Sequence, residues 1–377
     1  MENSPSRILV YRIGQIGDTV VALPALWAIR QHFPAAHITL LCNQQPGSSY
    51  VLASKILPNT GLIDDTLTYS SHENRTRPFE LLRLLGKLRR LKYDKLVYLA
   101  PRLRPSAAVA RDLVYFRLAG IRHFLGHKGF GLPLRIPEHP LQPTDHEADH
   151  LLKRLARTGI PIPKDGNGEM NLAISQVERR ATSDWLQARI PGWILKTNLV
   201  GLAPGSKWPS KVWPESRFME LGRRLIDELS LYPIVFGGEE DAELGNRLIE
   251  HWGTGTNAAG CLDVRLTASA LGFCSFYVGN DTGAMHLAAA VGTPCVAIMS
   301  AQDWPGRWDP YGRGHIVLRK TVACEGCLLS VCEREGLRCL NEIEVGEVIH
   351  ACKEVLTSGR LLQKSNLPDA AYGQAIC

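Results

Sequence analysis

Short strand-like runs alternate with helix-like segments along most of this chain, and this alternation limits the folds that it can adopt. Residues 8–11 form a β-rich run, Gly14 and Gly17 follow, residues 19–32 have helical character, and residues 38–42 form a second apolar run. A strand, a glycine-containing loop, a helix and a strand in this order make up a βαβ unit. The same alternation returns between residues 199 and 356. Repeated βα units predict parallel sheets with helices on both faces, a doubly wound α/β fold.

The length of 377 residues suggests two such domains, because a domain commonly holds about 150 residues. Prolines and glycines are frequent between residues 160 and 198, and we place the boundary there. We therefore expect an N-terminal domain over 1–180, a C-terminal domain over 181–356 and a tail over 357–377. Ligands of doubly wound sheets bind at the carboxyl ends of the strands, so two facing domains predict a shared cleft.

Composition narrows the class of protein further. Hydrophobic residues make up 45% of the chain and charged residues 21%, which is typical of globular proteins. The uninterrupted apolar runs are shorter than the roughly 18 to 20 residues that span a bilayer. Residues 1–7 lack the basic and then apolar pattern of a signal peptide. We expect a cytoplasmic protein.

The positive charge of the chain lies mainly in its first half. Residues 1–175 hold 23 Lys and Arg against 14 Asp and Glu, whereas residues 176–377 hold 20 against 23. This asymmetry indicates a phosphate-bearing substrate, an anionic membrane surface or a nucleic acid as partner, and an ordinary solvated basic surface is the alternative. Residues 79–92 form a basic segment with leucines at helical spacing, which either lies on a membrane or packs one face on a sheet. Because no nucleic-acid-binding motif is recognisable, we expect no nucleic acid partner.

The segment from Gly279 to His286 follows a strand-like run and opens a helix. Asp281 or Thr282 can cap that helix, and Gly283 allows a ligand to approach the backbone closely. The N-terminus of a helix attracts anions, so this loop could hold a diphosphate, with His286 about one turn further on. The alternative is an ordinary capped helix with a histidine in the core.

Two more loops follow strand-like runs. Residues 203–214 contain Ser206, Lys207 and Lys211, which offer a hydroxyl and positive charge to a phosphate group. Residues 14–18 end in Asp18, which could deprotonate an acceptor hydroxyl or could simply cap a helix. The loop is neither a dinucleotide fingerprint nor a P-loop. Glu239, after two glycines, could bind ligand hydroxyls or belong to the first turn of a helix.

Two further patterns involve possible metal ligands. Residues 146–150 formally match the H-E-x-x-H signature of zinc proteases, but that scaffold conflicts with a doubly wound fold. A second pattern consists of four cysteines with the spacing C-x2-C-x4-C-x6-C, namely Cys324, Cys327, Cys332 and Cys339. Four thiolates can hold structural zinc. Reduced or disulfide-linked structural cysteines, and a redox or iron–sulfur role, are the alternatives.

Taken together, the motifs resemble glycosyltransferase family 9, the ADP-heptose:lipopolysaccharide heptosyltransferases. The resemblance covers residues 7–350 and rests on residues 12–18, Pro24-Ala25-Leu26, Lys211-x-Trp213-Pro214, Phe236-Gly237-Gly238 and Asp281-Thr282-Gly283-x-x-His286. It implies a GT-B fold, in which two Rossmann-like domains face each other across a cleft. The N-terminal domain would bind the acceptor and the C-terminal domain the nucleotide sugar. The family inverts the anomeric carbon and needs no metal for catalysis.

The resemblance also implies a role for each candidate residue. Asp18 would be the base that activates the acceptor hydroxyl, and Lys211 would stabilise the charge on the departing ADP. The remaining candidates would bind the donor: Ser206 and the backbone of Thr282 and Gly283 at the phosphates, Asp281 at the sugar hydroxyls, Glu239 at the ribose, and His286 nearby.

We therefore expect an enzyme that moves heptose from ADP-heptose to a lipopolysaccharide or lipid A-core acceptor at the inner face of the cytoplasmic membrane. It would need no cofactor apart from possible structural zinc. A family member with another nucleotide sugar or glycan acceptor is one alternative. A non-catalytic nucleotide-sugar-binding protein is another, although the presence of both Asp18 and Lys211 argues against it.

Overall fold

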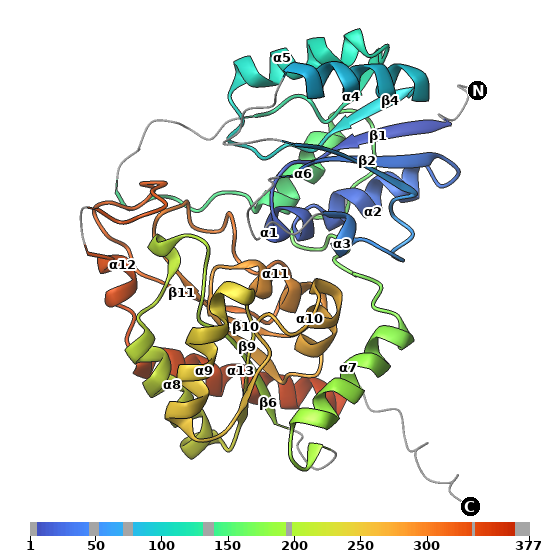
Figure 1. Cartoon of the computed structure of the whole chain (residues 1–377). Coiled ribbons are helices and arrows are strands. Elements are labelled where there is room, and N and C mark those ends of the chain that lie inside the picture. Colours follow the sequence, from blue (N-terminus) through green and yellow to red (C-terminus); the bar gives the residue numbers. More distant parts are fainter. Residues whose placement is uncertain are drawn as a thin grey trace, which may run out of the picture.

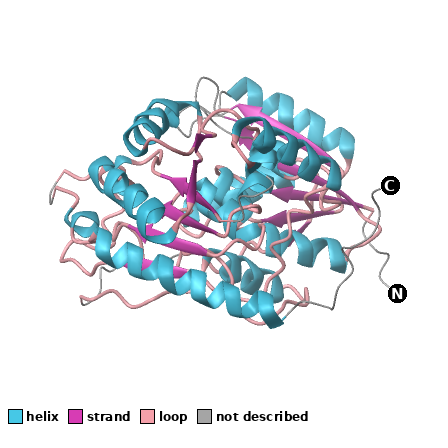
Figure 2. Ribbon diagram, turned by 90° about the horizontal axis from the view of Figure 1, so that it is seen from below, coloured by secondary structure: helices cyan, strands magenta, loops and turns pink. Residues whose placement is uncertain are grey.

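The computed structural model describes residues 6–44, 53–70, 78–130, 139–193, 198–333 and 336–365, with side chains described as far as residue 358. Helices and strands alternate through both halves of the described chain, and helices lie on both sides of the two sheets (Figures 1 and 2). The doubly wound α/β fold expected from the sequence is confirmed.

The first sheet has the strand order β3-β2-β1-β4-β5, counting the residues that the structure describes, and its pairs are parallel. Its strands are β1 (Arg7–Tyr11), β2 (His37–Gln44), β3 (Asp65–Ser70), β4 (Lys95–Tyr98) and β5 (His123–Leu125). The helices of this half are α1 (Ile16–Val20), α2 (Leu23–His32), α3 (Ala53–Ile56), α4 (Pro78–Leu91), α5 (Ser106–Leu118), α6 (Glu147–Ala156) and α7 (Gln176–Arg189).

Alternation along β1 distributes its side chains between two layers of helices. Ile8 and Val10 are buried in the cluster that includes α2 and α6, whereas Leu9 and Tyr11 are buried in the cluster that includes α4 and α5. Successive side chains of a strand point to opposite faces, so an unbroken apolar strand requires cover on both sides. The β-rich run that begins this sequence thus becomes the centre of a three-layer domain.

The second sheet, within the described residues, has the order β11-β10-β9-β6-β7-β8 and is also parallel. Its strands are β6 (Leu199–Ala203), β7 (Tyr232–Val235), β8 (Thr256–Asn257), β9 (Phe276–Asn280), β10 (Cys295–Met299) and β11 (Ile316–Arg319). Its helical segments are the 3-10 turns η2 (Pro209–Lys211) and η3 (Glu239–Asp241), with α8 (Glu215–Leu229), α9 (Ala242–Trp252), α10 (Val264–Leu271), α11 (Gly283–Ala290), α12 (Arg338–Asn341) and α13 (Val345–Ser365).

The helix expected over residues 19–32 is interrupted, which corrects the sequence prediction. The structure has α1 and α2 instead, with a break at Val21 and Ala22. Pro24 is the second residue of α2. A proline lacks the backbone N–H and clashes with the carbonyl one turn earlier, so a continuous helix through this position is unfavourable. The break leaves α1 as a short separate turn at the carboxyl end of β1.

The expected boundary at residue 180 falls inside α7, and the division into domains stays a prediction. Helix α13 continues to Ser365, past residue 356, where the C-terminal domain was expected to end. The part of the expected tail beyond residue 365 lies outside the described residues. In the part of the chain that is described, every helix is too short or too polar to cross a bilayer.

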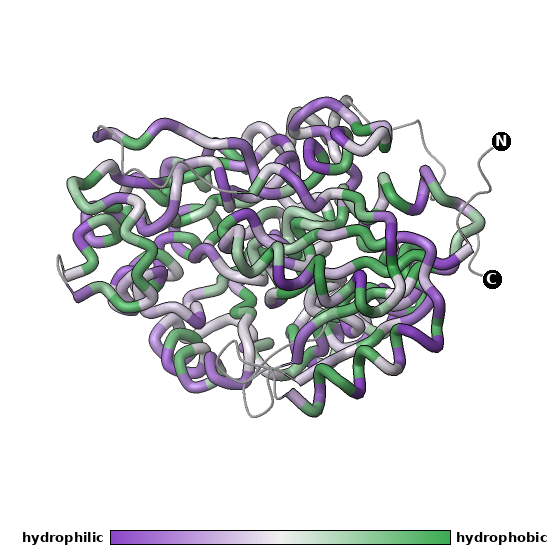
Figure 3. The backbone as a smooth tube through the Cα atoms, turned by 90° about the horizontal axis from the view of Figure 1, so that it is seen from above, coloured by the Kyte–Doolittle hydropathy of each residue, from purple (hydrophilic) through white to green (hydrophobic). Residues whose placement is uncertain are grey.

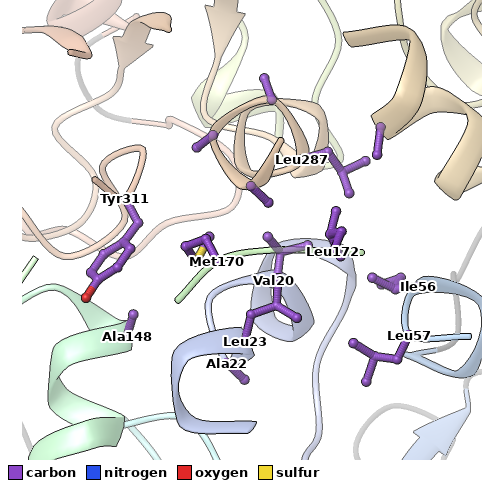
Figure 4. Close-up of a cluster of buried hydrophobic side chains, with 14 of the residues drawn as sticks. Val20, Ala22, Leu23, Ile56, Leu57, Ala148, Met170, Leu172, Leu287 and Tyr311 are labelled. Carbon is purple, nitrogen blue, oxygen red and sulfur yellow. The ribbon is translucent and has the colours of Figure 1, made fainter. Parts of the chain in front are cut away.

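A buried apolar cluster joins the two halves (Figure 4). It brings Val20 and Leu23 of the first half together with Leu287 of α11 and with Met170 and Leu172 from the segment between the halves. Helices α1 and α11 pack closely within it. A Cβ on Gly17 would lie 2.9 Å from a ring carbon of His286, and a Cβ on Gly283 would lie 3.0 Å from the Ile16 Cβ. Glycine at these two positions therefore permits the close approach of the helices.

Candidate active site

A cleft of about 1180 Å³ lies where the carboxyl ends of the two sheets meet. Its volume exceeds that of a typical small-molecule pocket, about 300 to 1000 Å³, so it has room for a large ligand. All eight cleft residues expected from the sequence line it: Asp18, Ser206, Lys211, Glu239, Asp281, Thr282, Gly283 and His286.

Asp18 comes from the first half, in the short helix after β1. Its Oδ2 accepts a hydrogen bond from the Gln15 backbone N–H at 2.9 Å, and its Oδ1 lies 3.4 Å from the buried Arg12 guanidinium. The Asp18 side chain keeps 24% of its surface exposed, on the side of the cleft. Gly14 has φ +126°, and a Cβ there would overlap the Asp18 carboxylate. The glycine loop thus makes room for an oriented, accessible carboxylate that takes part in capping α1. Its role as a base stays a prediction.

Lys211 and Asp281 approach the cleft from two loops of the second sheet. The Lys211 Nζ donates a hydrogen bond to the Asp281 Oδ2 at 2.6 Å, and both side chains are largely buried, with 16% and 8% exposed. The Lys211 ammonium also lies 5.2 Å from the centre of the Trp208 ring. A carboxylate on one side and an aromatic face on the other fix the position of the cation.

Two buried polar groups support these loops. Asn280 accepts a hydrogen bond from the Trp213 backbone N–H at 3.1 Å and donates one to the Pro204 carbonyl at 2.6 Å. Ser210, next to Lys211, donates to the Leu329 carbonyl at 2.6 Å. Both loops that carry the Lys211–Asp281 pair are therefore held through backbone groups.

Helix α11 begins at Gly283, with Thr282 as its N-cap, and no side chain hydrogen bond caps this end. Thr282 and Gly283 line the cleft, so the first backbone N–H groups of this eight-residue helix open toward it. Such a terminus carries a partial positive charge and attracts anions.

His286 is buried, and its Nε2 lies 3.9 Å from the Asp281 Oδ1. Burial lowers the pKa of His286 to about 4, although the neighbouring Asp281 carboxylate raises it. The imidazole is therefore neutral near pH 7. Its Nδ1 is buried and has no hydrogen-bond partner in the structure.

Ser206 and Glu239 lie in the part of the cleft formed by the β6 and β7 ends. Between them sits Asp241, which the sequence analysis did not select. Its carboxylate would overlap a Cβ on either Gly205 or Gly237, and its Oδ2 accepts from the Gly238 N–H at 2.9 Å. The paired glycines of these two loops could have indicated a buried side chain between them.

A buried ionic cluster, which the sequence analysis also missed, borders the cleft at the junction of the halves. Glu147 is completely buried, and its Oε2 lies 3.2 Å from Nε of Arg307, a cleft residue of the second half. Its Oε1 accepts the Arg102 backbone N–H at 2.9 Å. Burial alone would raise the pKa of Glu147, but the charges of Arg307 and other arginines lower it below its ordinary value.

The first histidine of the H-E-x-x-H match has a structural role. His146 caps α6 through the Ala148 N–H, and its Nε2 lies 2.9 Å from the Asp309 carbonyl.

The four cysteines of the second pattern lie together, away from the cleft chemistry. All four line a small cavity beside Ser210 and Gln302. Burial raises the pKa of Cys339, and the nearby Cys332 and Cys327 raise it further. Within the described residues, however, no group of three or more His, Cys, Asp or Glu is arranged to hold a metal ion. The zinc interpretation therefore stays a prediction.

Comparison with known proteins identifies the class of the molecule. The model for "Glycosyltransferase family 9 (heptosyltransferase)" matches residues 81–337. Lipopolysaccharide heptosyltransferase 2 of Escherichia coli (strain K12) is 27% identical over 362 residues, which cover 89% of this chain and 97% of that protein.

Solved structures agree with this match. A glycosyl transferase family 9 protein from Veillonella parvula DSM 2008 has a TM-score of 0.72 and 22% identity, covering 95% of this chain and 99% of its own. The E. coli ADP-heptose lps heptosyltransferase II has a TM-score of 0.66 and 20% identity, covering 94% and 99%.

Two parallel sheets with helices on both sides, together with these structural neighbours, define the GT-B fold. The chain belongs to glycosyltransferase family 9, the heptosyltransferase family. The fold class, the family and the enzyme class expected from the sequence are thereby confirmed.

Proposed function

We propose that this enzyme transfers heptose from ADP-heptose to a lipopolysaccharide core acceptor with inversion at the anomeric carbon. One observation carries the proposal. The accessible Asp18 carboxylate enters the cleft from one sheet, while Lys211, Asp281 and the open N-terminus of α11 enter it from the other.

This arrangement supplies what an inverting transfer needs. Asp18 accepts the proton of an acceptor hydroxyl, whose oxygen forms a bond to the anomeric carbon from one face. The bond between that carbon and the diphosphate oxygen breaks on the opposite face, and ADP leaves with the electron pair. Negative charge therefore develops on the diphosphate, where Lys211 and the α11 N–H groups stabilise it. Because these groups already provide positive charge, we propose that the reaction requires no metal ion.

The other cleft residues would bind the donor. Asp281, held by Lys211, would accept hydrogen bonds from sugar hydroxyls, and Ser206 would contact a phosphate. Glu239, on the exposed turn η3, would bind the ribose. His286 is neutral at physiological pH, so it would act as a hydrogen-bonding group and not as a cation.

The proposed acceptor is lipid-borne, so the enzyme would work at the inner face of the cytoplasmic membrane as a peripheral protein. The relatives support this choice, since the E. coli protein compared above is a lipopolysaccharide heptosyltransferase. The basic first half of the chain is suited to the phosphates and carboxylates of such an acceptor.

The test is transfer from ADP-heptose to truncated lipopolysaccharide acceptors, with the anomeric configuration of the product read by NMR and the reaction repeated in EDTA. We expect product of inverted configuration with undiminished rate in EDTA. If no product forms but another nucleotide sugar raises the melting temperature, the donor assignment is wrong. If no nucleotide sugar does so, the catalytic proposal fails.

A further inference from the structure

Helices α4 and α5 lie side by side on the face of the first sheet that points away from the second sheet (Figure 1). Two contacts join them. The Tyr115 hydroxyl donates to the Leu81 carbonyl at 2.7 Å, and the Arg89 Nε donates to the Leu118 carbonyl at 2.8 Å. Their inner sides are buried on the sheet through Leu84, Leu88 and Phe116. The leucine stripe recognised in the sequence therefore packs on a sheet, and the opposite sides of both helices remain free for another partner.

Those outer sides carry large apolar side chains that are well exposed. The exposed fractions are 73% for Phe79, 66% for Leu82, 54% for Val114 and 55% for Leu118. Phe79 and Leu82 are three residues apart on α4, and Val114 and Leu118 are four apart on α5, so each pair shares one helix face. We call these four residues the α4–α5 apolar patch. Figure 3 views the backbone from the side of these helices, and hydrophobic and hydrophilic residues are mixed along it.

The exposed charges on the two helices are of one sign. The exposed charged residues of α4 and α5 are all basic: Arg83, Lys87, Arg89, Arg90, Arg111 and Arg117. The two helices contain two acidic residues, and neither is fully exposed. Glu80 is half-buried, and Asp112 is buried beside Arg104. Apolar side chains surrounded by Lys and Arg are suited to a bilayer, which has an apolar interior and anionic headgroups.

The patch also lies in a useful place relative to the cleft. In a parallel sheet with returning helices, each helix begins at the carboxyl edge of the strands. Phe79 and Leu82 are in the first turns of α4, and α5 begins just after Leu103, which lines the cleft. Phe79, Leu82 and the wall that holds Asp18 thus lie toward the same edge of the first sheet.

We propose that α4 and α5 form the surface on which this enzyme docks on an anionic lipid bilayer. Phe79 and Leu82 insert at the depth of the headgroups, and the basic residues bind lipid phosphates. This inference rests on the proposed function only in that it brings the cleft to a bilayer-borne acceptor. The binding itself requires neither donor nor acceptor, so it can be tested alone.

The first experiment is co-sedimentation of the full chain with vesicles of mixed phosphatidylglycerol and phosphatidylcholine, and with vesicles of phosphatidylcholine alone. We expect binding to the anionic vesicles only, weakened as salt screens the charges. Wild-type chain that stays in solution with the anionic vesicles, or that binds both vesicles equally at all salt concentrations, overturns the inference.

The second experiment compares two triple variants that remove equal charge. One is Leu82→Ser/Arg83→Gln/Lys87→Gln on α4, and the matched control is Val177→Ser/Arg179→Gln/Arg180→Gln on α7. Each removes two exposed basic residues and one exposed aliphatic side chain from a helix. Arg89 is left unchanged because its side chain donates a hydrogen bond to the Leu118 carbonyl.

Each basic residue that is lost should weaken binding to the anionic vesicles about fivefold. We therefore expect the α4 variant to bind anionic vesicles at least about 25-fold more weakly than wild type, and the control to bind as wild type does. Equal binding by both variants overturns the assignment of the surface. A lipid-free dimer that dissociates in the α4 variant alone would also overturn it, because the patch would then join two copies of the chain.

Transfer assays separate this inference from the proposed function. With acceptor in vesicles the α4 variant should lose rate, and with the same acceptor in detergent it should match wild type. A chain that docks through this face but transfers no heptose contradicts the proposed function alone. A chain that transfers heptose while the α4 variant keeps wild-type vesicle binding contradicts the docking surface alone.

Discussion

The Lys211 ammonium and the Asp281 carboxylate meet at 2.6 Å across the cleft wall, although 70 residues separate them in the chain. The pair joins the loop after β6 to the loop after β9, the two central strands of the second sheet. It places a cation and a carboxylate side by side. In the proposed donor, a diphosphate for the cation lies next to sugar hydroxyls for the carboxylate. Because both side chains are largely buried, the effect of removing either one should depend on the other.

A double-mutant cycle tests this dependence. Lys211→Ala should lower kcat by about 100-fold or more, because positive charge is lost where the leaving group develops negative charge. Asp281→Ala should weaken donor binding about 10- to 100-fold, measured by calorimetry. The cycle compares the free energy of donor binding in all variants. The double variant should lose less of it than the two single variants lose together, with a coupling energy of about 0.5 to 3 kcal/mol. Strict additivity would mean that the two groups act separately.

Asp18→Asn tests the proposed base. The amide oxygen can still accept the Gln15 N–H, so the fold of α1 and donor binding should be retained. The amide cannot take a proton, so kcat should fall by about 100- to 10,000-fold. A matched control is Asp94→Asn, which alters a carboxylate that accepts the Ser6 and Arg7 N–H groups in the same domain. Near-normal turnover of Asp18→Asn would remove Asp18 as the base.

Glu178 predicts a specific pH dependence of stability. Its Oε2 accepts from Arg265 Nη2 at 3.0 Å, and hydrogen bonding by this guanidinium lowers the pKa of Glu178 to about 2. A lowered folded-state pKa stabilises the fold above the unfolded pKa of about 4.3, and the stabilisation is lost as pH falls toward 2. Glu178→Gln should therefore cost on the order of 3 kcal/mol at pH 7 and roughly half of that at pH 3. Urea unfolding at both values measures this, and a difference that is constant with pH would contradict the ion pair.

The buried Glu147 should matter far more than an exposed ion pair. Glu147→Gln removes the charge that faces Arg307 and Arg102, and it should lower the free energy of unfolding by about 3 to 5 kcal/mol. The control is Glu342→Gln, whose partner Arg338 is 60% exposed and whose loss should cost about 0.5 kcal/mol. The measurement is chemical denaturation at pH 7. Equal effects of the two substitutions would show that the cluster does not stabilise the junction.

Cys324→Ser/Cys327→Ser tests the thiol cavity. The loop that holds these cysteines continues to Leu329, whose carbonyl accepts a hydrogen bond from Ser210. Because the substitutions weaken this loop, they should lower the melting temperature and leave kcat nearly unchanged. The exposed Cys261→Ser serves as control. Mass spectrometry of the native protein before and after chelation reads metal content directly. A variant that is as stable as wild type but inactive would contradict a structural role.

The cleft could be predicted because its residues follow strand-like runs. Asp18, Lys211 and Asp281 each come shortly after an apolar run that forms a strand, and parallel strands bring the segments after them to one edge. Contacts between loops distant in the chain could not be predicted in this way. Asp241 lies in a space left by two glycines of different loops, and Glu147 meets an arginine 160 residues away. The break between α1 and α2 was missed although Pro24 marks it, because apolar periodicity continues across the break.

The apolar cluster between the halves has a consequence for dividing this protein. Val20, Leu287 and Met170 belong to one buried cluster, to which both halves and the segment between them contribute. If the halves were expressed as separate fragments, each would expose its part of this apolar cluster to solvent. Chimeras that exchange one half for that of a distant family member would therefore have to exchange the residues of this cluster in the other half as well.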